Sequence, residues 1–343
     1  MTVAVCPGCG TQVAPALLAC PACHWLVHAE ELKGLAAQAE QATGARDRSA
    51  ALATWRQALE LLPGDTRQHD AISEKIAALS REIDAGAPAA TTSTEKRNAL
   101  GKGAAGLGAV GVLLSKFKLL VGLLLTKGKL LLLGLTKAGT LFSMLLSAGV
   151  YWTMWGWKFA LGVVLSIYIH EMGHVQALQR YGIKATAPMF IPGFGAVIRL
   201  KQYPANARED ARVGLAGPLW GLGAAAVAYV AYLATGAGIW GAIGHFGAWV
   251  NLFNLVPVWQ LDGARGFRAL ARHQRWLATA VIAVMWLVTG EGLLALLLVA
   301  AGLAAALGRA AEAPDTPALL EYAWLVAVLS LVTLIPVATG TTG

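Results

Sequence analysis

The clearest chemical motif in the chain is His170-Glu171-Met172-Gly173-His174, an H-E-x-x-H sequence inside an apolar segment. Residues four apart share one face of a helix, so His170 and His174 can offer two imidazole nitrogens to one metal ion. Glu171 points to the side of that pair, where a carboxylate can take a proton from metal-bound water. Ionisable side chains at membrane depth are costly, so we interpret the motif as a functional site. Chance occurrence, or histidines that cap a buried helix, are the alternatives.

Asp262 is the predicted third ligand of the same metal. The H-E-x-x-H segment exits into a loop rich in Lys and Arg, and arginines at 265, 268, 272 and 275 follow Asp262. Lys and Arg concentrate on the cytosolic side of membrane proteins, so both motifs are expected at the same depth. Tetrahedral catalytic zinc takes three protein ligands and keeps one position open for water. The alternative is that Asp262 caps a helix at the turn with Gly263.

The cysteines of the chain form two C-x-x-C pairs, Cys6 with Cys9 and Cys20 with Cys23. Four thiolates at this spacing predict a tetrahedral structural zinc, with small residues in the turn of each pair. A closed set of four sulfurs leaves no open position, so this zinc would hold structure and do no chemistry. A redox dithiol, or two disulfides in an exported segment, are the alternatives.

The composition predicts an integral membrane protein that carries a soluble piece. Of its 343 residues, 57% are hydrophobic and only 13% are charged. Met1 to Gly10 contain no apolar segment of the signal-peptide type, so we expect no cleavable signal and a cytosolic N-terminal domain. We interpret the net charge of +8 in terms of membrane orientation and anionic lipid, and expect no nucleic-acid partner.

The soluble piece is predicted to be a zinc ribbon over residues 1–28 and a helical region over residues 29–86. Amphipathic runs predict helices at about Glu30–Thr43, Ser49–Leu62 and Thr66–Ile83. The second run is similar to half of a tetratricopeptide repeat, and one such unit cannot bury its own core. We interpret the region either as a docking module for a protein partner or as a helical spacer packed on the zinc ribbon.

Two further segments precede the predicted membrane core. Residues 87–106 are rich in Ala, Thr, Ser and Gly without periodicity, which predicts a flexible linker. In residues 107–137, the Lys-x-Lys pattern of Lys116-Phe117-Lys118 is repeated eleven residues later in Lys127-Gly128-Lys129, and the residues between are mostly apolar. We interpret this segment as an interfacial element with snorkelling lysines, and an ordinary positive flank of the first span is the alternative.

Residues 138–340 are predicted to form a mainly α-helical transmembrane bundle of six to seven spans. An aromatic belt closes the first span and consists of Tyr151, Trp152, Trp155 and Trp157. Glu291 is interpreted as a turn residue between two short apolar runs that are counted as one or two crossings. The expected spans are about Ala138–Trp155, Phe159–Ala177, Ala211–Leu233, Trp240–Val256 and Leu319–Pro336, with the short runs at Trp276–Thr289 and Leu293–Leu307.

The loop from Ala187 to Lys201 has a different character from the spans on either side of it. Its β-branched and aromatic residues are interrupted by Pro188, Pro192 and Gly195. This pattern predicts short strands or a hairpin near the membrane. An edge strand at this place can pair with an extended peptide segment.

Two motifs together closely resemble the site-2 protease family of intramembrane zinc metalloproteases: the H-E-x-x-H sequence at 170–174 and Asn254-x-x-Pro257-x-x-x-Leu261-Asp262-Gly263. The likeness covers roughly Gly156 to Arg272, and the preceding span fits the family's first core helix. No PDZ-sized insertion separates the two motifs. The sequence Ala216-Gly217-Pro218-Leu219 is similar to the opening of the family's third core span, although Trp220 and Gly221 stand where a small residue and Asn are usual.

The resemblance implies that His170, His174 and Asp262 bind zinc and that Glu171 is the general base. It also implies that Asn254 orients the substrate or stabilises the oxyanion. The implied substrate is a transmembrane protein, cleaved within the membrane as part of regulated proteolysis. The N-terminal domain lies outside the family core, and by its position it is a candidate to screen substrates.

Two other classes of protein stay open on the residues alone. A metal transporter also buries His and Asp among spans, but it needs further polar residues along a path, and the outer halves of these spans lack them. A catalytically inactive scaffold that binds partners through the N-terminal domain would not need Glu171. We therefore expect a zinc metalloendopeptidase of the inner or plasma membrane, in contact with lipid.

Overall fold

The computed structural model describes residues 4–14, 17–86, 138–193, 195–198, 200 and 202–336. The predicted linker at 87–106 and the predicted interfacial segment at 107–137 lie outside the described residues. Within these ranges the chain has eleven helices and two two-stranded sheets, so the predicted mainly α-helical class is confirmed. The chain divides into two compact units, and Leu178–Lys184 and Leu200–Asn206 belong to the first, N-terminal unit.

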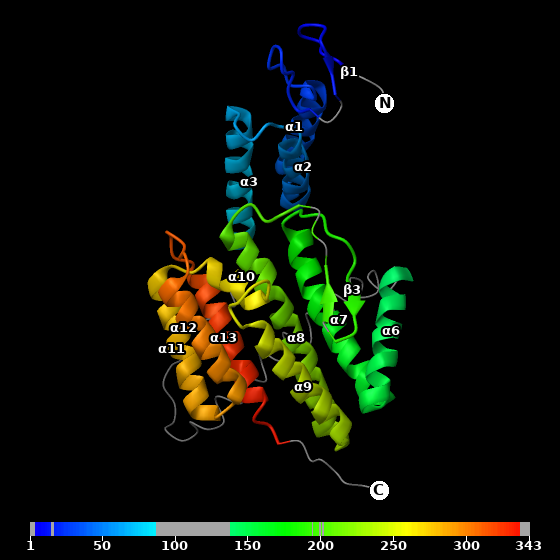
Figure 1. The fold of residues 1–343 in the computed structure, drawn as a ribbon, viewed down its shortest axis with the longest axis vertical. Coiled ribbons are helices and arrows are strands. Elements are labelled where there is room, and N and C mark those ends of the chain that lie inside the picture. Colours follow the sequence, from blue (N-terminus) through cyan, green and yellow to red (C-terminus); the bar gives the residue numbers. More distant parts are fainter. Residues whose placement is uncertain are drawn as a thin grey trace. The chain divides into compact units, whose positions relative to one another are not determined.

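The helices of the second unit closely match the predicted apolar runs (Figure 1). Gly156 and Gly290 have φ of 81° and 66°, and these left-handed residues separate α6 from α7 and α11 from α12. Glu291 caps α12, so the turn predicted at this residue is confirmed and the two short apolar runs form two helices. The helices are α6 (Ala138–Trp155), α7 (Trp157–Arg180), α8 (Ala207–Thr235), α9 (Gly238–Asn254), α10 (Asp262–Arg268), α11 (Arg272–Thr289), α12 (Gly292–Leu307) and α13 (Thr316–Val332).

One helix in the described part of the chain, α8, is long and apolar enough to cross a membrane. The predicted number of six to seven spans therefore stays a prediction. The largest apolar core of this unit lies among α8 to α13, where Leu252, Leu294 and Tyr322 are fully buried. A second core joins α6 and α7 around Tyr168. These two cores fix α7 and α10, which carry the predicted metal ligands.

A short hairpin follows α7, in the loop where strands were predicted. Strand β3 (Met189–Ile191) pairs antiparallel with β4 (Gly195–Val197). The hydroxyl of Thr140 donates to Pro188 O at 2.9 Å, and Phe190 N donates to Ser143 Oγ at 3.1 Å. Helix α6 thus satisfies backbone groups along the side of β3 that faces away from β4.

The first unit begins with two equivalent cysteine turns. Strand β1 (Ala4–Val5) pairs antiparallel with β2 (Gln12–Val13) across the first turn. Gly10 N donates to Cys6 O at 2.9 Å, and His24 N donates to Cys20 O at 2.8 Å. Gly10 and His24, each the residue after the second cysteine of its pair, both have positive φ, at 73° and 59°. The chain therefore folds each C-x-x-C pair in the same way.

Three helices follow the cysteine turns and cover the three predicted amphipathic runs: α1 (Ala29–Gly44), α2 (Arg48–Glu60) and α3 (Arg67–Gly86) (Figure 1). Asp47 caps α2 by accepting a hydrogen bond from Ala50 N at 3.0 Å. Leu52 and Ile76 are fully buried between these helices, so the helical region has an apolar core of its own.

The last turn of α7 lies in the first unit and is capped there. Ile183 N donates to Leu178 O and Gly182 N donates to Gln179 O, which is the Schellman arrangement that ends a helix. Carbonyls in the last turn of a helix lack intrahelical partners. Ser49 Oγ donates to the carbonyls of residues 179 and 180 at 2.9 and 2.7 Å, and Arg56 Nε donates to the carbonyl of residue 181 at 3.1 Å. Side chains of α2 therefore donate hydrogen bonds to the free backbone carbonyls at the end of the H-E-x-x-H helix.

Replacement of Gly182 by Ala is expected to destabilise the first unit. Gly182 has φ of +63°, and a Cβ there would lie 2.6 Å from Ala53 N and 2.7 Å from Ser49 O. The left-handed backbone alone costs a residue with a Cβ about 1–2 kcal/mol. Thermal unfolding and limited proteolysis of the purified full chain would measure the loss, with Gly64→Ala, where a Cβ meets nothing within 4 Å, as the control. Equal stability of the two variants would contradict the close packing of α2 on this turn.

Candidate metal centre

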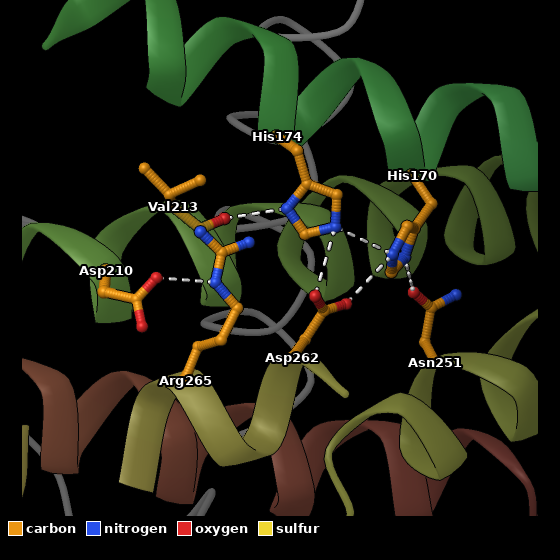
Figure 2. Close-up of polar contacts among 7 residues, drawn as sticks. All are labelled: His170, His174, Asp210, Val213, Asn251, Asp262 and Arg265. Atoms are coloured by element: carbon orange, nitrogen blue, oxygen red, sulfur yellow. Dashed lines mark hydrogen bonds and ion pairs between the residues drawn. The ribbon is translucent and has the colours of Figure 1, made fainter. Parts of the chain in front are cut away.

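The predicted ligands His170, His174 and Asp262 come together in the second unit (Figure 2). His170 Nε2 and His174 Nε2 are 3.1 Å apart. One Asp262 oxygen lies 3.1 Å from His170 Nε2, and the other lies 3.3 Å from His174 Nε2. All three residues are buried. The N-cap position of α10 is held by Leu261, so the alternative that Asp262 serves only as a helix cap is wrong.

The spacing of these donor atoms suits zinc. Nitrogen and oxygen ligands at 2.0–2.1 Å from a tetrahedral zinc ion are about 3.3 Å from one another. The three distances of 3.1 to 3.3 Å among the ligand atoms match that value. Two imidazoles and one carboxylate are also a donor set of catalytic zinc sites, which keep a fourth position open. The residues therefore fit the predicted ion.

The second nitrogen of each imidazole is held by an acceptor on another helix (Figure 2). His174 Nδ1 lies 2.7 Å from Val213 O on α8. His170 Nδ1 lies 2.7 Å from Asn251 Oδ1 on α9, and the Asn251 amide group is oriented by its donation to Gly247 O at 2.7 Å. Carbonyl oxygens only accept, so each Nδ1 carries a proton, and in the neutral imidazole Nε2 then keeps a lone pair for a metal.

This arrangement needs a cation to be stable. Two neutral imidazoles that direct lone pairs at each other cannot form a hydrogen bond between their Nε2 atoms. A buried carboxylate beside them adds a negative charge in a poorly solvated place. Asn251 and the Val213 carbonyl are therefore partners of the predicted ligands that the sequence analysis did not identify. For Asn251 the signal was a polar side chain one helical turn before Asn254 in an apolar helix.

Glycines let α8 pass directly against the ligands. A Cβ on Gly217 would lie 2.2 Å from His174 Nε2 and 2.7 Å from His170 Nε2. A Cβ on Gly173 of α7 would lie 2.3 Å from Ala216 O on α8. The Ala216-Gly217-Pro218-Leu219 sequence thus leaves the space on this side of the imidazoles free of side chains.

The remaining predicted residues are Glu171, which follows His170 in α7, and Asn254 in α9. The Glu171 side chain is buried, and it has no hydrogen bond or ion pair with the described residues. A carboxylate without such a partner is able to exchange a proton with water. Asn254 is the last residue of α9 and is half-buried. It is Asn251, and not Asn254, that contacts a predicted ligand.

The four cysteines of the first unit also form a cluster that suits a metal. Cys6 Sγ and Cys23 Sγ are 3.6 Å apart, and Cys9 Sγ and Cys20 Sγ are 3.7 Å apart. Sulfur ligands at 2.3 Å from a tetrahedral zinc ion are about 3.8 Å from one another. A disulfide would bring two sulfurs to about 2 Å, and none of the four cysteines is in a disulfide. The cluster is therefore compatible with the predicted structural zinc.

Ionisation of the cluster also favours a bound cation. Hydrogen bonds with the hydroxyl and backbone of Thr11 lower the pKa of Cys9 to about 6, so this sulfur is a thiolate at neutral pH. A hydrogen bond from the Trp25 backbone lowers the pKa of Cys23, but the neighbouring Cys9 sulfur and burial outweigh it and raise that pKa to about 12. A second thiolate beside the first therefore needs a cation to offset their repulsion.

Replacement of Gly217 by Ala is expected to lower the metal affinity of the second unit by at least about tenfold, the scale on which neighbours of metal ligands act. The methyl group would occupy the space next to both Nε2 atoms. Metal content and competition titration with a chelator would measure the change. Gly302→Ala is the matched control, because Gly302 lies in apolar helix α12 and a Cβ there meets nothing within 4 Å. Wild-type affinity in the Gly217 variant would show that the metal does not bind at this place.

Comparison with known proteins points to the same chemistry. Residues 158–238 match the model of peptidase family M50. A curated relative, "Probable zinc metalloprotease EGY2, chloroplastic" of Arabidopsis thaliana, is 37% identical over 67 residues. That stretch is 18% of this chain and spans only 12% of the relative's length. No solved structure gives a significant match. Both matches support a metalloprotease, and over residues 158–238 the resemblance of the chain to the site-2 protease family, peptidase family M50, is confirmed.

Proposed function

We propose that this chain is an intramembrane zinc metalloprotease that hydrolyses peptide bonds of membrane-embedded proteins. The observation that carries the proposal is the convergence of His170 Nε2, His174 Nε2 and the Asp262 carboxylate at tetrahedral spacing. The buried carboxylate of Glu171 follows His170 in the same helix. A scaffold would need neither this geometry nor a buried, unpartnered carboxylate.

His170, His174 and Asp262 would hold the zinc ion, with Asn251 and the Val213 carbonyl fixing the two imidazoles. When bound, zinc supplies a Lewis acid that lowers the pKa of a coordinated water toward about 7. Glu171 takes the proton of the attacking water and then donates it to the leaving amine. Asn254, at the end of α9, is proposed to orient the substrate carbonyl or to donate to its developing negative charge.

Exposed apolar side chains of the second unit support a place in the lipid bilayer. Phe142 on α6, Leu287 on α11 and Leu307 on α12 are 70%, 78% and 82% exposed. A soluble surface rarely carries so many large apolar side chains, whereas hydrocarbon solvates them well. The further spans beside α8 and a cytosolic N-terminal unit are part of this proposal. The N-terminal helices would serve there as a docking module for a protein partner.

A transmembrane substrate must unwind before cleavage, because a helix hides its carbonyls in hydrogen bonds. Strand addition to the β3–β4 hairpin would hold such an unwound segment. Side chains of α6 already bind the outer backbone groups of β3. We therefore assign the substrate-binding edge to β4, at Gly195–Val197.

Glu171→Gln is expected to keep zinc and to lower the cleavage rate by about 10²–10⁴-fold, the usual contribution of a general base. The amide is close in size to the carboxylate but cannot accept the proton. Zinc content and cleavage of a model transmembrane substrate in proteoliposomes would be measured together. Glu291→Gln, a change at the turn between α11 and α12, is the control and should cleave at the wild-type rate. A Glu171→Gln protein that cuts as fast as wild type would refute the assignment.

The full chain is expected to bind two zinc ions, one at each site. Cys20→Ser removes a fully buried sulfur of the first site, and His174→Ala removes a nitrogen of the second. Each variant should retain one ion, and only His174→Ala should lose cleavage because of a missing catalytic ligand. Elemental analysis of the purified chain gives the count. If the wild-type chain binds one ion and a variant still binds it, then the site altered in that variant holds no zinc and is removed from the proposal.

A further inference from the structure

Helix α10 is too short to fix the position of the third ligand by itself. It has seven residues, and Asp262 is the first of them. An isolated helix of this length is unstable, because its few hydrogen bonds do not offset the cost of starting it. Gly263 and Gly266 lower its helix propensity further. The geometry of the Asp262 carboxylate must therefore be set by whatever anchors α10.

Asp210, in the first turn of α8, anchors this helix with both of its carboxylate oxygens. Arg265 Nε donates to Asp210 Oδ1 at 2.8 Å (Figure 2). Arg268 Nη2 donates to Asp210 Oδ2 at 2.7 Å. The side chains of Asp210 and Arg265 are only 19% and 16% exposed, whereas that of Arg268 is 47% exposed. Exposed ion pairs contribute little, so of these two ion pairs the one with Arg265 contributes more to the position of α10, in addition to the apolar packing of Phe267.

The same stretch of α8 also serves the other side of the metal centre. Val213 O orients the ring of His174, as Figure 2 shows. Gly214 lies so close to α10 that a Cβ there would be 2.7 Å from Arg265 Cβ and 3.1 Å from Asp262 O. Residues 210 to 214 of α8 therefore contact both the His174 ring and the helix that carries Asp262, and they can position the two ligands relative to each other.

Charge makes Asp210 important for a second reason. Arg265 is three residues after Asp262, so the two side chains lie on neighbouring positions of the helix. Asp210 is the sole ion-pair partner of Arg265 among the described residues, and the buried Nη2 atom of Arg265 has no hydrogen bond with them. Without Asp210, an uncompensated guanidinium would remain close to a site that must accept a divalent cation.

We propose that Asp210 is a positioning residue of the metal centre, which acts through Arg265 to hold Asp262 in register with His170 and His174. This inference rests on the proposed function, because it concerns the same metal site. Asp210 touches neither metal nor substrate in this proposal. Its effect is exerted on the geometry and affinity of the three-residue ligand set.

The chain offers a closely matched control for this proposal. Asp315, the N-cap of α13, also receives two arginines of α8, Arg212 at 2.7 Å and Arg208 at 3.5 Å. It is at least as buried as Asp210, but it ties α8 to α13 and not to the metal-bearing helix. Asp315→Asn therefore reports the cost of breaking a similar network on α8 that makes no ion pair with α10.

The experiment compares a reference protein with Asp210→Asn, Asp210→Glu and Asp315→Asn, all as purified full chains. Co²⁺ is the probe, because its visible absorption reports coordination geometry, and Cys20→Ser is present in every protein to remove the sulfur site. Asp210→Asn is expected to weaken Co²⁺ binding by about 10–100-fold, the range for partners of metal ligands, and to alter the absorption band. Asp210→Glu should restore much of both. Asp315→Asn should lower the unfolding temperature and leave affinity and band unchanged.

Two outcomes would overturn the inference. One is that Asp210→Asn has the Co²⁺ affinity and absorption of the reference protein, and the other is that Asp315→Asn loses as much Co²⁺ affinity as Asp210→Asn. Either result would leave the proposed protease function intact, provided that the wild-type pattern of binding and cleavage holds. If the reference protein binds no Co²⁺ and His174→Ala changes nothing, then the proposed function itself fails, and the inference fails with it.

Discussion

The second unit depends on one electrostatic constraint: two imidazole lone pairs and a carboxylate meet in a buried place. Each pair of ligand atoms is 3.1 to 3.3 Å apart, and in the neutral imidazoles the two Nε2 atoms have no proton to share because Nδ1 is the donor of each ring. Such an arrangement is unfavourable without a cation and strongly favourable with one. The surrounding contacts are best understood as the structure that keeps these groups together.

Helix α8 contributes most to that structure, through a backbone carbonyl and through glycines that leave room for the neighbouring groups. Val213 offers a carbonyl, while Gly214 and Gly217 allow α10 and the imidazoles to approach the helix axis. Pro218 follows directly and removes one backbone donor from the helix. A larger side chain at Gly217 would fill the space beside both ligands, so the small residues here are a requirement of the site and not of helix stability.

Local patterns in the sequence were enough for the helices and for part of the site. The apolar runs that were predicted to end at Trp155 and Thr289 gave helix ends that the structure confirms. Gly156 and Gly290 follow them and adopt the left-handed turn at low cost. The pairing of His170 with His174 follows from helical spacing alone. Asn251, Val213 and Asp210 were not found, since their partners lie 81, 39 and 55 residues away in sequence. A helix at Asp262 entered the sequence analysis only as an alternative, because the glycines of α10 oppose a helix and its packing against α8 and α13 is not visible in the local sequence.

Gly221 illustrates why a site has to be judged by its geometry as well as by its motifs. The family pattern leads one to expect an Asn at this position of the third core span, and the chain has none there. A Cβ on Gly221 would lie 2.0 Å from Asn251 Oδ1, so the glycine leaves open the space that the Asn251 side chain occupies. From that place the Asn251 amide holds His170 Nδ1 at 2.7 Å. The amide beside the first histidine therefore comes from α9, and the glycine on α8 leaves the room that this side chain needs.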